Sequence, residues 1–130
     1  MLQTAYRLLD EALALMAQHR RGEALSRFES ALSAAVSPEA RAIVARNAGM
    51  AYEQCQQLKE AIRCFEIAVA NDPQDGRTYL VLASLEQQQG NLDVARGHLW
   101  RAKQIAIETD DEELRTFIKR SELSGGDDAS

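Results

Sequence analysis

The chain has 130 residues and a net charge of −5, with 45% hydrophobic and 27% charged residues. This length suits one domain that buries about two-thirds of its unfolded surface. The acidic balance argues against nonspecific nucleic-acid binding, which needs a basic surface, and against docking on anionic lipid. No apolar run approaches the roughly 18 residues of a membrane span. The first residues show no basic region followed by a continuous apolar core, so we expect no signal peptide. We therefore expect a cytoplasmic protein that does not insert into membranes.

The first segment, MLQTAYRLLDEALALM, carries more apolar surface than one packing face needs. One helical stripe contains Leu8, Ala12 and Leu15. A second stripe lies beside it, stepping by four, three, four and three, and consists of Leu2, Tyr6, Leu9, Leu13 and Met16. A surface helix normally needs an apolar arc of only about 100°. The second stripe therefore needs a partner of its own.

Three later segments repeat one spacing: an alanine, a large apolar residue four positions on, and an alanine three positions after that. The triplets are Ala24, Phe28 and Ala31; Ala61, Phe65 and Ala68; and Ala95, Leu99 and Ala102. They lie 37 and 34 residues apart, and each follows a second stretch of helical periodicity. No β-branched alternation occurs, so we expect helices and no strands.

This pattern resembles the tetratricopeptide repeat, a helix-turn-helix unit of about 34 residues. The second repeat matches the family pattern best, at Gly49, Tyr52, Ala61, Phe65, Ala68 and Pro73. The resemblance implies an all-α, right-handed superhelical solenoid of three helix-turn-helix repeats with a seventh, capping helix. We expect one domain at 1–122, with repeats near 5–36, 42–75 and 76–109, a capping helix near 110–122, and a disordered tail at 123–130.

Local signals give the expected boundaries of several helices. Ser37 and Pro38 read as an N-cap followed by proline at the first helical position. Gly90 and Asn91 read as the turn inside the third repeat. Residues 109–112, TDDE, have the spacing of a capping box and should begin the seventh helix.

In solenoids of this family the first helix of each pair lines a concave groove, so the resemblance places the second stripe on the groove wall. The implied apolar anchors are Tyr6, Leu9, Leu13, Met16, Ile43 and Met50, with Asn47 and Leu80 completing the lining. Arg46 and Arg77 would orient an acidic group or chain end. The implied ligand is an apolar segment of another protein, either extended or an amphipathic helix.

Three alternatives remain open. The stripe could join two copies of the chain into a homo-oligomer, the protein could be a chaperone for a secreted or assembling substrate, or the stripe could pack within the protomer. The clamp with which some family members hold acidic chaperone tails is not expected. Its sites fall on Leu9, Leu13, Asn47, Arg77 and Val81, of which only Asn47 has the clamp residue.

The residues offer no chemistry of a catalytic site. His19 and His98 have no third ligand at metal spacing, and Cys55 and Cys64 form no CxxC motif. No glycine-rich phosphate loop or nucleophile motif occurs. We therefore expect a binding protein and no enzyme, cofactor or metal. Twelve arginines against three lysines favour a bacterial origin.

Overall fold

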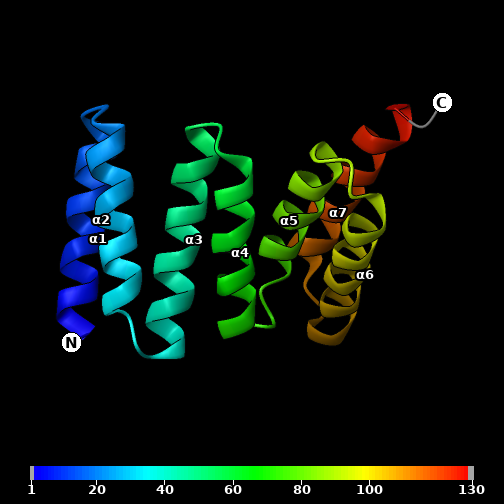
Figure 1. Cartoon of the computed structure of the whole chain (residues 1–130). Coiled ribbons are helices and arrows are strands. Elements are labelled where there is room, and N and C mark those ends of the chain that lie inside the picture. The colour runs from blue at the N-terminus through cyan, green and yellow to red at the C-terminus, as the bar shows by residue number, and fades with distance from the viewer. Residues whose placement is uncertain (1, 129–130) are drawn as a thin grey trace. The chain divides into compact units, whose positions relative to one another are not determined.

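The computed structural model describes the backbone of residues 2–128 and the side chains of residues 3–122. Within this part of the chain there are seven helices and no strand (Figure 1). They are α1 (Leu2–Ala17), α2 (Arg21–Ala34), α3 (Pro38–Gln54), α4 (Leu58–Asn71), α5 (Gly76–Gln88), α6 (Leu92–Thr109) and α7 (Glu112–Asp128). The all-α fold class, with three helix pairs and a seventh helix, is confirmed. The Leu2 side chain, assigned to the second stripe, lies outside the described residues.

The chain divides into two compact units, Met1–Pro73 and Gln74–Ser130, where the sequence predicts a single domain. Unit 1 contains α1 to α4 and unit 2 contains α5 to α7. A groove lined by residues of both units therefore remains a prediction.

Unit 1 consists of two antiparallel helix pairs, α1 with α2 and α3 with α4, and α3 also contacts both helices of the first pair (Figure 1). The first two of the repeated triplets form its core: all four of their alanines are 0% exposed, and Phe28 and Phe65 are 0% and 2% exposed. Small residues allow the close approach of paired helices. At Gly49 an added Cβ would lie 2.9 Å from three ring atoms of Phe65.

A polar cluster joins the two helix pairs of unit 1. The Glu29 carboxylate on α2 accepts hydrogen bonds from the Tyr52 hydroxyl on α3 and from the Arg63 guanidinium on α4. Arg63 Nε also donates to Glu60 Oε2 at 2.9 Å. Burial and the bond to Glu29 raise the pKa of Tyr52, so its hydroxyl stays a donor at neutral pH.

Unit 2 is held together by a core that α6 and α7 share. Ala102, Ile105 and Ala106 of α6 pack with Leu114 and Ile118 of α7, all at most 5% exposed. Tyr79, Leu80 and Leu99 pack against this cluster. The seventh helix therefore covers apolar surface of the last helix pair, as a capping helix does.

The caps explain where several helices begin. Ser37 Oγ accepts the Ala40 N–H at 3.1 Å, with Pro38 in the first turn, as predicted. Gly90 has φ +84°, which suits the predicted turn because glycine adopts this conformation without steric cost. At the start of α7 the prediction misplaced the cap. Asp111, not Thr109, accepts the Leu114 N–H, at 2.9 Å, because Asp110 takes a left-handed conformation that ends α6.

The seventh helix extends to Asp128, beyond the expected end at residue 122. The tail expected to be disordered, 123–130, falls on residues whose side chains, or at 129–130 the whole residues, lie outside the description.

Candidate functional site

An apolar surface runs along α1 and α3 in unit 1, and we call it the α1/α3 face. It comprises Tyr6, Leu13, Met16, Ile43 and Met50. Leu13 and Met50 are its most open members, with 42% and 51% of their surfaces exposed, and the others are half-buried. Leu13 and Met50 are 37 residues apart, which is the spacing between the first two repeats, so they hold equivalent positions on two helices in contact.

Leu9 is the predicted anchor that does not belong to this face. Its side chain is only 6% exposed, with Ala5 and Ala12 at 0% on the same helix. The surplus apolar arc of α1 is therefore divided between two uses. Leu9 packs inside unit 1, where α1 meets both α2 and α3, while Leu13 remains available at the surface.

The polar residues predicted beside these anchors already have partners within unit 1. Arg46 Nη1 donates to Asp72 Oδ2 at 3.4 Å, and both side chains are partly exposed. The Asn47 side-chain amide donates to the Ile43 carbonyl, one turn back on the same helix, at 2.8 Å. The arginine expected to orient a ligand's acidic group therefore has an acidic partner in the chain itself.

Two exposed carboxylates, Asp10 and Glu53, border the α1/α3 face, and sequence reasoning missed Asp10. Asp10 lies three positions before Leu13, and Glu53 lies three positions after Met50, so each is a surface neighbour of an anchor. Neither forms an ion pair with any residue that the structure describes. The i, i+3 spacing from the apolar anchor Leu13 is the signal that could have identified Asp10.

The predicted site residues of unit 2 are engaged within that unit. Arg77 Nη2 lies 2.6 Å from Glu113 Oε1, and its Cζ lies 4.8 Å from the centre of the Phe117 ring. Leu80 is half-buried against the α6–α7 core. The capping helix thus supplies both a carboxylate and an aromatic ring to Arg77.

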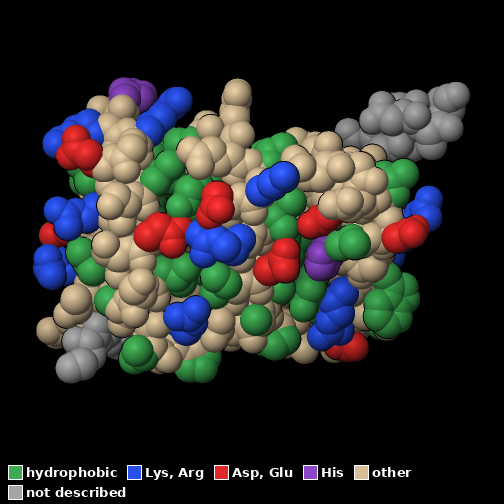
Figure 2. Space-filling view, viewed as in Figure 1, with side chains coloured by type: hydrophobic (Ala, Val, Ile, Leu, Met, Phe, Trp, Pro, Cys, Tyr) green, Lys and Arg blue, Asp and Glu red, His purple; other side chains and the backbone are tan. Residues whose placement is uncertain are grey.

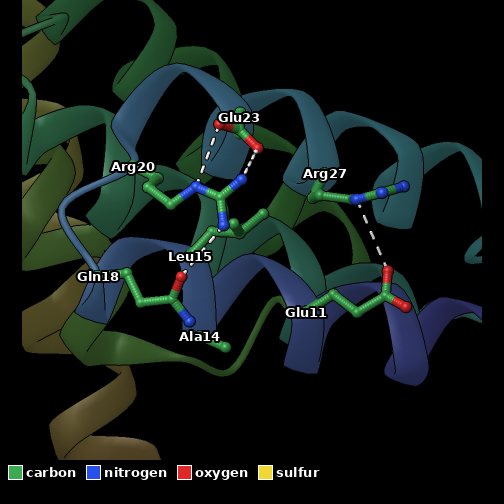
Figure 3. A pocket seen from close by; sticks show the side chains of 7 residues that line it. All are labelled: Glu11, Ala14, Leu15, Gln18, Arg20, Glu23 and Arg27. Carbon is green, nitrogen blue, oxygen red and sulfur yellow. Dashed lines mark hydrogen bonds and ion pairs between the residues drawn. The ribbon is translucent and has the colours of Figure 1, made fainter.

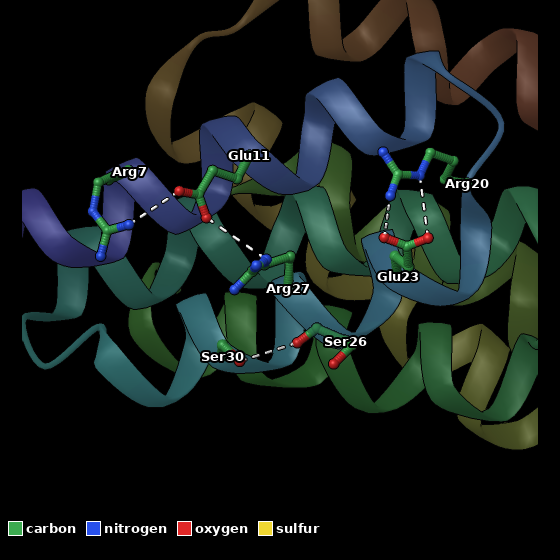
Figure 4. A network of polar contacts seen from close by, with 7 residues as sticks. All are labelled: Arg7, Glu11, Arg20, Glu23, Ser26, Arg27 and Ser30. Atoms are coloured by element: carbon green, nitrogen blue, oxygen red, sulfur yellow. Dashed lines mark hydrogen bonds and ion pairs between the residues drawn. The ribbon is translucent and has the colours of Figure 1, made fainter.

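A shallow depression lies between α1 and α2, lined by Glu11, Ala14, Leu15, Gln18, Arg20, Glu23 and Arg27 (Figure 3). Its charged groups neutralise one another. Arg20 pairs with Glu23 at 2.5 Å, and Glu11 lies between Arg7 and Arg27 at 3.0 and 3.6 Å (Figure 4). The lining contains no cysteine, histidine or hydroxyl side chain, and both of its carboxylates are paired with arginine.

The two cysteines are free thiols, and they differ in exposure. Cys64 is 0% exposed, and burial raises its pKa to about 11. A thiol with this pKa is protonated at neutral pH and is a poor nucleophile or metal ligand. Over the described residues no three metal-binding side chains cluster, and no helix has the length and apolar character of a membrane span.

Other apolar side chains are exposed in unit 2. Trp100 and Ile107 of α6 are 61% and 64% exposed. They are seven positions apart and share one side of the helix. On the face drawn in Figure 2, basic and acidic side chains are interspersed over each unit, with hydrophobic side chains between them.

Comparison with known proteins agrees with this geometry. Among the solved structures to which the chain is similar are the following three, whose 16–18% identity is evidence for the fold alone. PcrH in complex with the chaperone-binding region of PopB has a TM-score of 0.75, 16% identity and coverage of 92% of this chain and 94% of that chain. The type III secretion translocator chaperone SycD of Yersinia enterocolitica has a TM-score of 0.72 and 16% identity, and the match covers 95% of this chain and 89% of that chain. The second repeat domain of Spaghetti (RPAP3), bound to the HSP90 peptide SRMEEVD, has a TM-score of 0.67 and 18% identity, and the match covers 80% of this chain and 94% of that chain.

These structures define the class as helical repeat proteins built from antiparallel pairs. A sequence model described as tetratricopeptide repeat matches residues 46–107. Over this stretch the chain matches the tetratricopeptide repeat family, which confirms the family predicted from the sequence. The comparison with curated proteins gave no match.

Proposed function

We propose that this protein is a non-catalytic adaptor or scaffold that binds a peptide or amphipathic helix of a partner protein on the α1/α3 face. The observation that carries the proposal is the exposure of Leu13 and Met50 at equivalent positions of two adjacent helices. Isolated exposed apolar residues are ordinary, but neighbouring ones bordered by polar residues are typical of interaction surfaces. The similar structures of PcrH and of the Spaghetti domain each hold a segment of another protein.

The size of the face sets the expected strength of binding. Full burial of a Leu or Met side chain is worth about 1.5–3 kcal/mol, and about half of each anchor is already buried, so each adds about 1 kcal/mol. Tyr6, Met16 and Ile43 add smaller amounts. Since association itself costs about 4–15 kcal/mol, this small apolar gain favours weak, reversible binding rather than an obligate complex.

A selection from a random peptide display library tests the proposal even though the partner is unidentified. The bait is the full chain, and the test variant is Leu13→Asp/Met50→Asp. The control variant, Leu92→Asp/Ile107→Asp, makes the same change in charge at two apolar residues of α6 that are at least as exposed as the test residues. Peptides that bind the wild type and the control but not the test variant support the proposal. Equal binding to all three baits contradicts it.

Self-association through the same face is the second candidate, favoured by the same exposed anchors. A similar SycD structure is described as an alternative dimer. Sedimentation velocity over a micromolar concentration series separates the two functions. A dimer that is lost in Leu13→Asp/Met50→Asp supports self-association through this face. A wild-type protein that is monomeric at the highest concentration excludes self-association as the function. A role as a chaperone for a secreted protein requires that the selected peptides match a segment of such a substrate.

A further inference from the structure

The charges of α1 and α3 are unequally compensated. All three arginines of these helices have partners: Arg7 pairs with Glu11 at 3.0 Å, and Arg46 with Asp72 at 3.4 Å. Arg41 donates to the carbonyl oxygens of Leu32 and Ala35 in the connection before α3. Three carboxylates on the same helices have no ion-pair partner among the described residues: Glu39 in the first turn of α3, and Asp10 and Glu53 beside the α1/α3 face.

Asp10 and Glu53 lie where the flanks of a bound segment would pass. Asp10 is one helical turn from both Tyr6 and Leu13, and Glu53 is one turn from Met50. A ligand that covers the exposed anchors therefore brings its neighbouring residues within a few ångströms of the two carboxylates. This distance is shorter than the screening length of about 8 Å at physiological ionic strength.

We infer that the segment bound on the α1/α3 face is apolar at its centre and carries lysine or arginine, rather than acidic residues, on its flanks. The inference rests on the proposed function and specifies its ligand. An acidic flank would be repelled by Asp10 and Glu53, and a ligand carboxylate near Arg46 would also meet Asp72. Unit 1 as a whole adds no attraction for acids, since it contains eight basic and nine acidic side chains.

The expected effect is modest because the charges lie at the solvent-exposed rim. Each exposed pair changes affinity by about 1.5- to 5-fold. Replacing both basic flanks by acidic flanks exchanges two attractions for two repulsions, so we expect affinity to fall by about tenfold. Because salt screens exposed charges, this difference should shrink markedly at about 0.5 M salt.

The same display selection tests this inference with one more pair of variants. Asp10→Lys/Glu53→Lys reverses the two charges on the face. The control Glu23→Lys/Glu66→Lys makes the same change in net charge at exposed positions of α2 and α4 in the same unit. A peptide selected on the wild type is then synthesised with lysine, alanine or glutamate flanks, and its Kd is measured by fluorescence anisotropy at low and high salt.

The expected result is enrichment of basic flanks on the wild type and on the control, and its loss or reversal on Asp10→Lys/Glu53→Lys. The lysine-flanked peptide should bind about tenfold more tightly than the glutamate-flanked one at low salt. Enrichment of acidic flanks, or equal Kd values for the three peptides, overturns the inference while leaving the proposed function intact. If no peptide distinguishes the wild type from Leu13→Asp/Met50→Asp, the proposed function fails and the inference fails with it.

Discussion

Replacing Gly49 by alanine tests whether the close approach of α3 and α4 depends on the missing side chain. An ideal Cβ at residue 49 lies 2.9 Å from Cε1, Cε2 and Cζ of Phe65, which is closer than real Cβ contacts. The ring is 2% exposed and has little room to move. Gly97 of α6 provides the matched control, because an added Cβ there meets nothing within 4 Å.

Two effects oppose each other in this substitution. Alanine in place of glycine inside a helix stabilises by about 0.5–1 kcal/mol, and overpacking a core typically costs about 1–3 kcal/mol. We therefore expect Gly49→Ala to lower the free energy of unfolding by about 1 kcal/mol. Gly97→Ala should raise it by about 0.5–1 kcal/mol, because only the helix-propensity gain applies.

Urea denaturation followed by far-UV circular dichroism measures both free energies of unfolding. Adding Phe65→Leu to Gly49→Ala should remove the clash, so the two changes should be non-additive by about 1 kcal/mol. The reasoning is refuted if Gly49→Ala stabilises the protein as much as Gly97→Ala, or if the double variant shows simple additivity.

Three further predictions concern the thiols and a helix cap. Iodoacetamide should modify the partly exposed Cys55 in the folded protein and Cys64 only on unfolding; equal rates would contradict the burial of Cys64. Because the folded-state pKa of Cys64 is raised to about 11, its stabilising effect is complete below its unfolded pKa and is lost as pH rises through about 9 to 11. The free energy of unfolding should thus fall over this range and fall less steeply in Cys64→Ala; parallel curves would exclude this thiol as the cause. Ser37→Ala removes the bond to the Ala40 N–H and should cost about 1 kcal/mol in urea denaturation, whereas an unchanged midpoint would show that Pro38 alone sets the start of α3.

The repeated triplets predicted the pairing and core of the fold because their spacing encodes a local geometry. Each triplet lies within one helix, and its 3.6-residue periodicity fixes which side is buried. Ser37 and Gly90 were predictable for the same reason, since caps and turns are determined by neighbouring residues.

The site was predicted less completely because it depends on contacts between helices. Leu9 and Leu13 belong to one stripe in sequence, and only the contact of α1 with α3 separates a buried residue from an exposed one. The Arg46–Asp72 and Arg77–Glu113 pairs join residues 26 and 36 positions apart, beyond the reach of any helical periodicity. Spacing alone identifies charged residues but not their partners.

Methyl NMR offers the most direct measurement of the central claim, that the α1/α3 face holds a partner segment. The full chain, labelled at leucine, isoleucine and methionine methyl groups, is titrated with a peptide from the display selection. The account predicts that the largest chemical-shift changes occur at Leu13, Ile43 and Met50. Changes confined to Ile107 and its surroundings on α6, with Leu13 and Met50 unmoved, would contradict it.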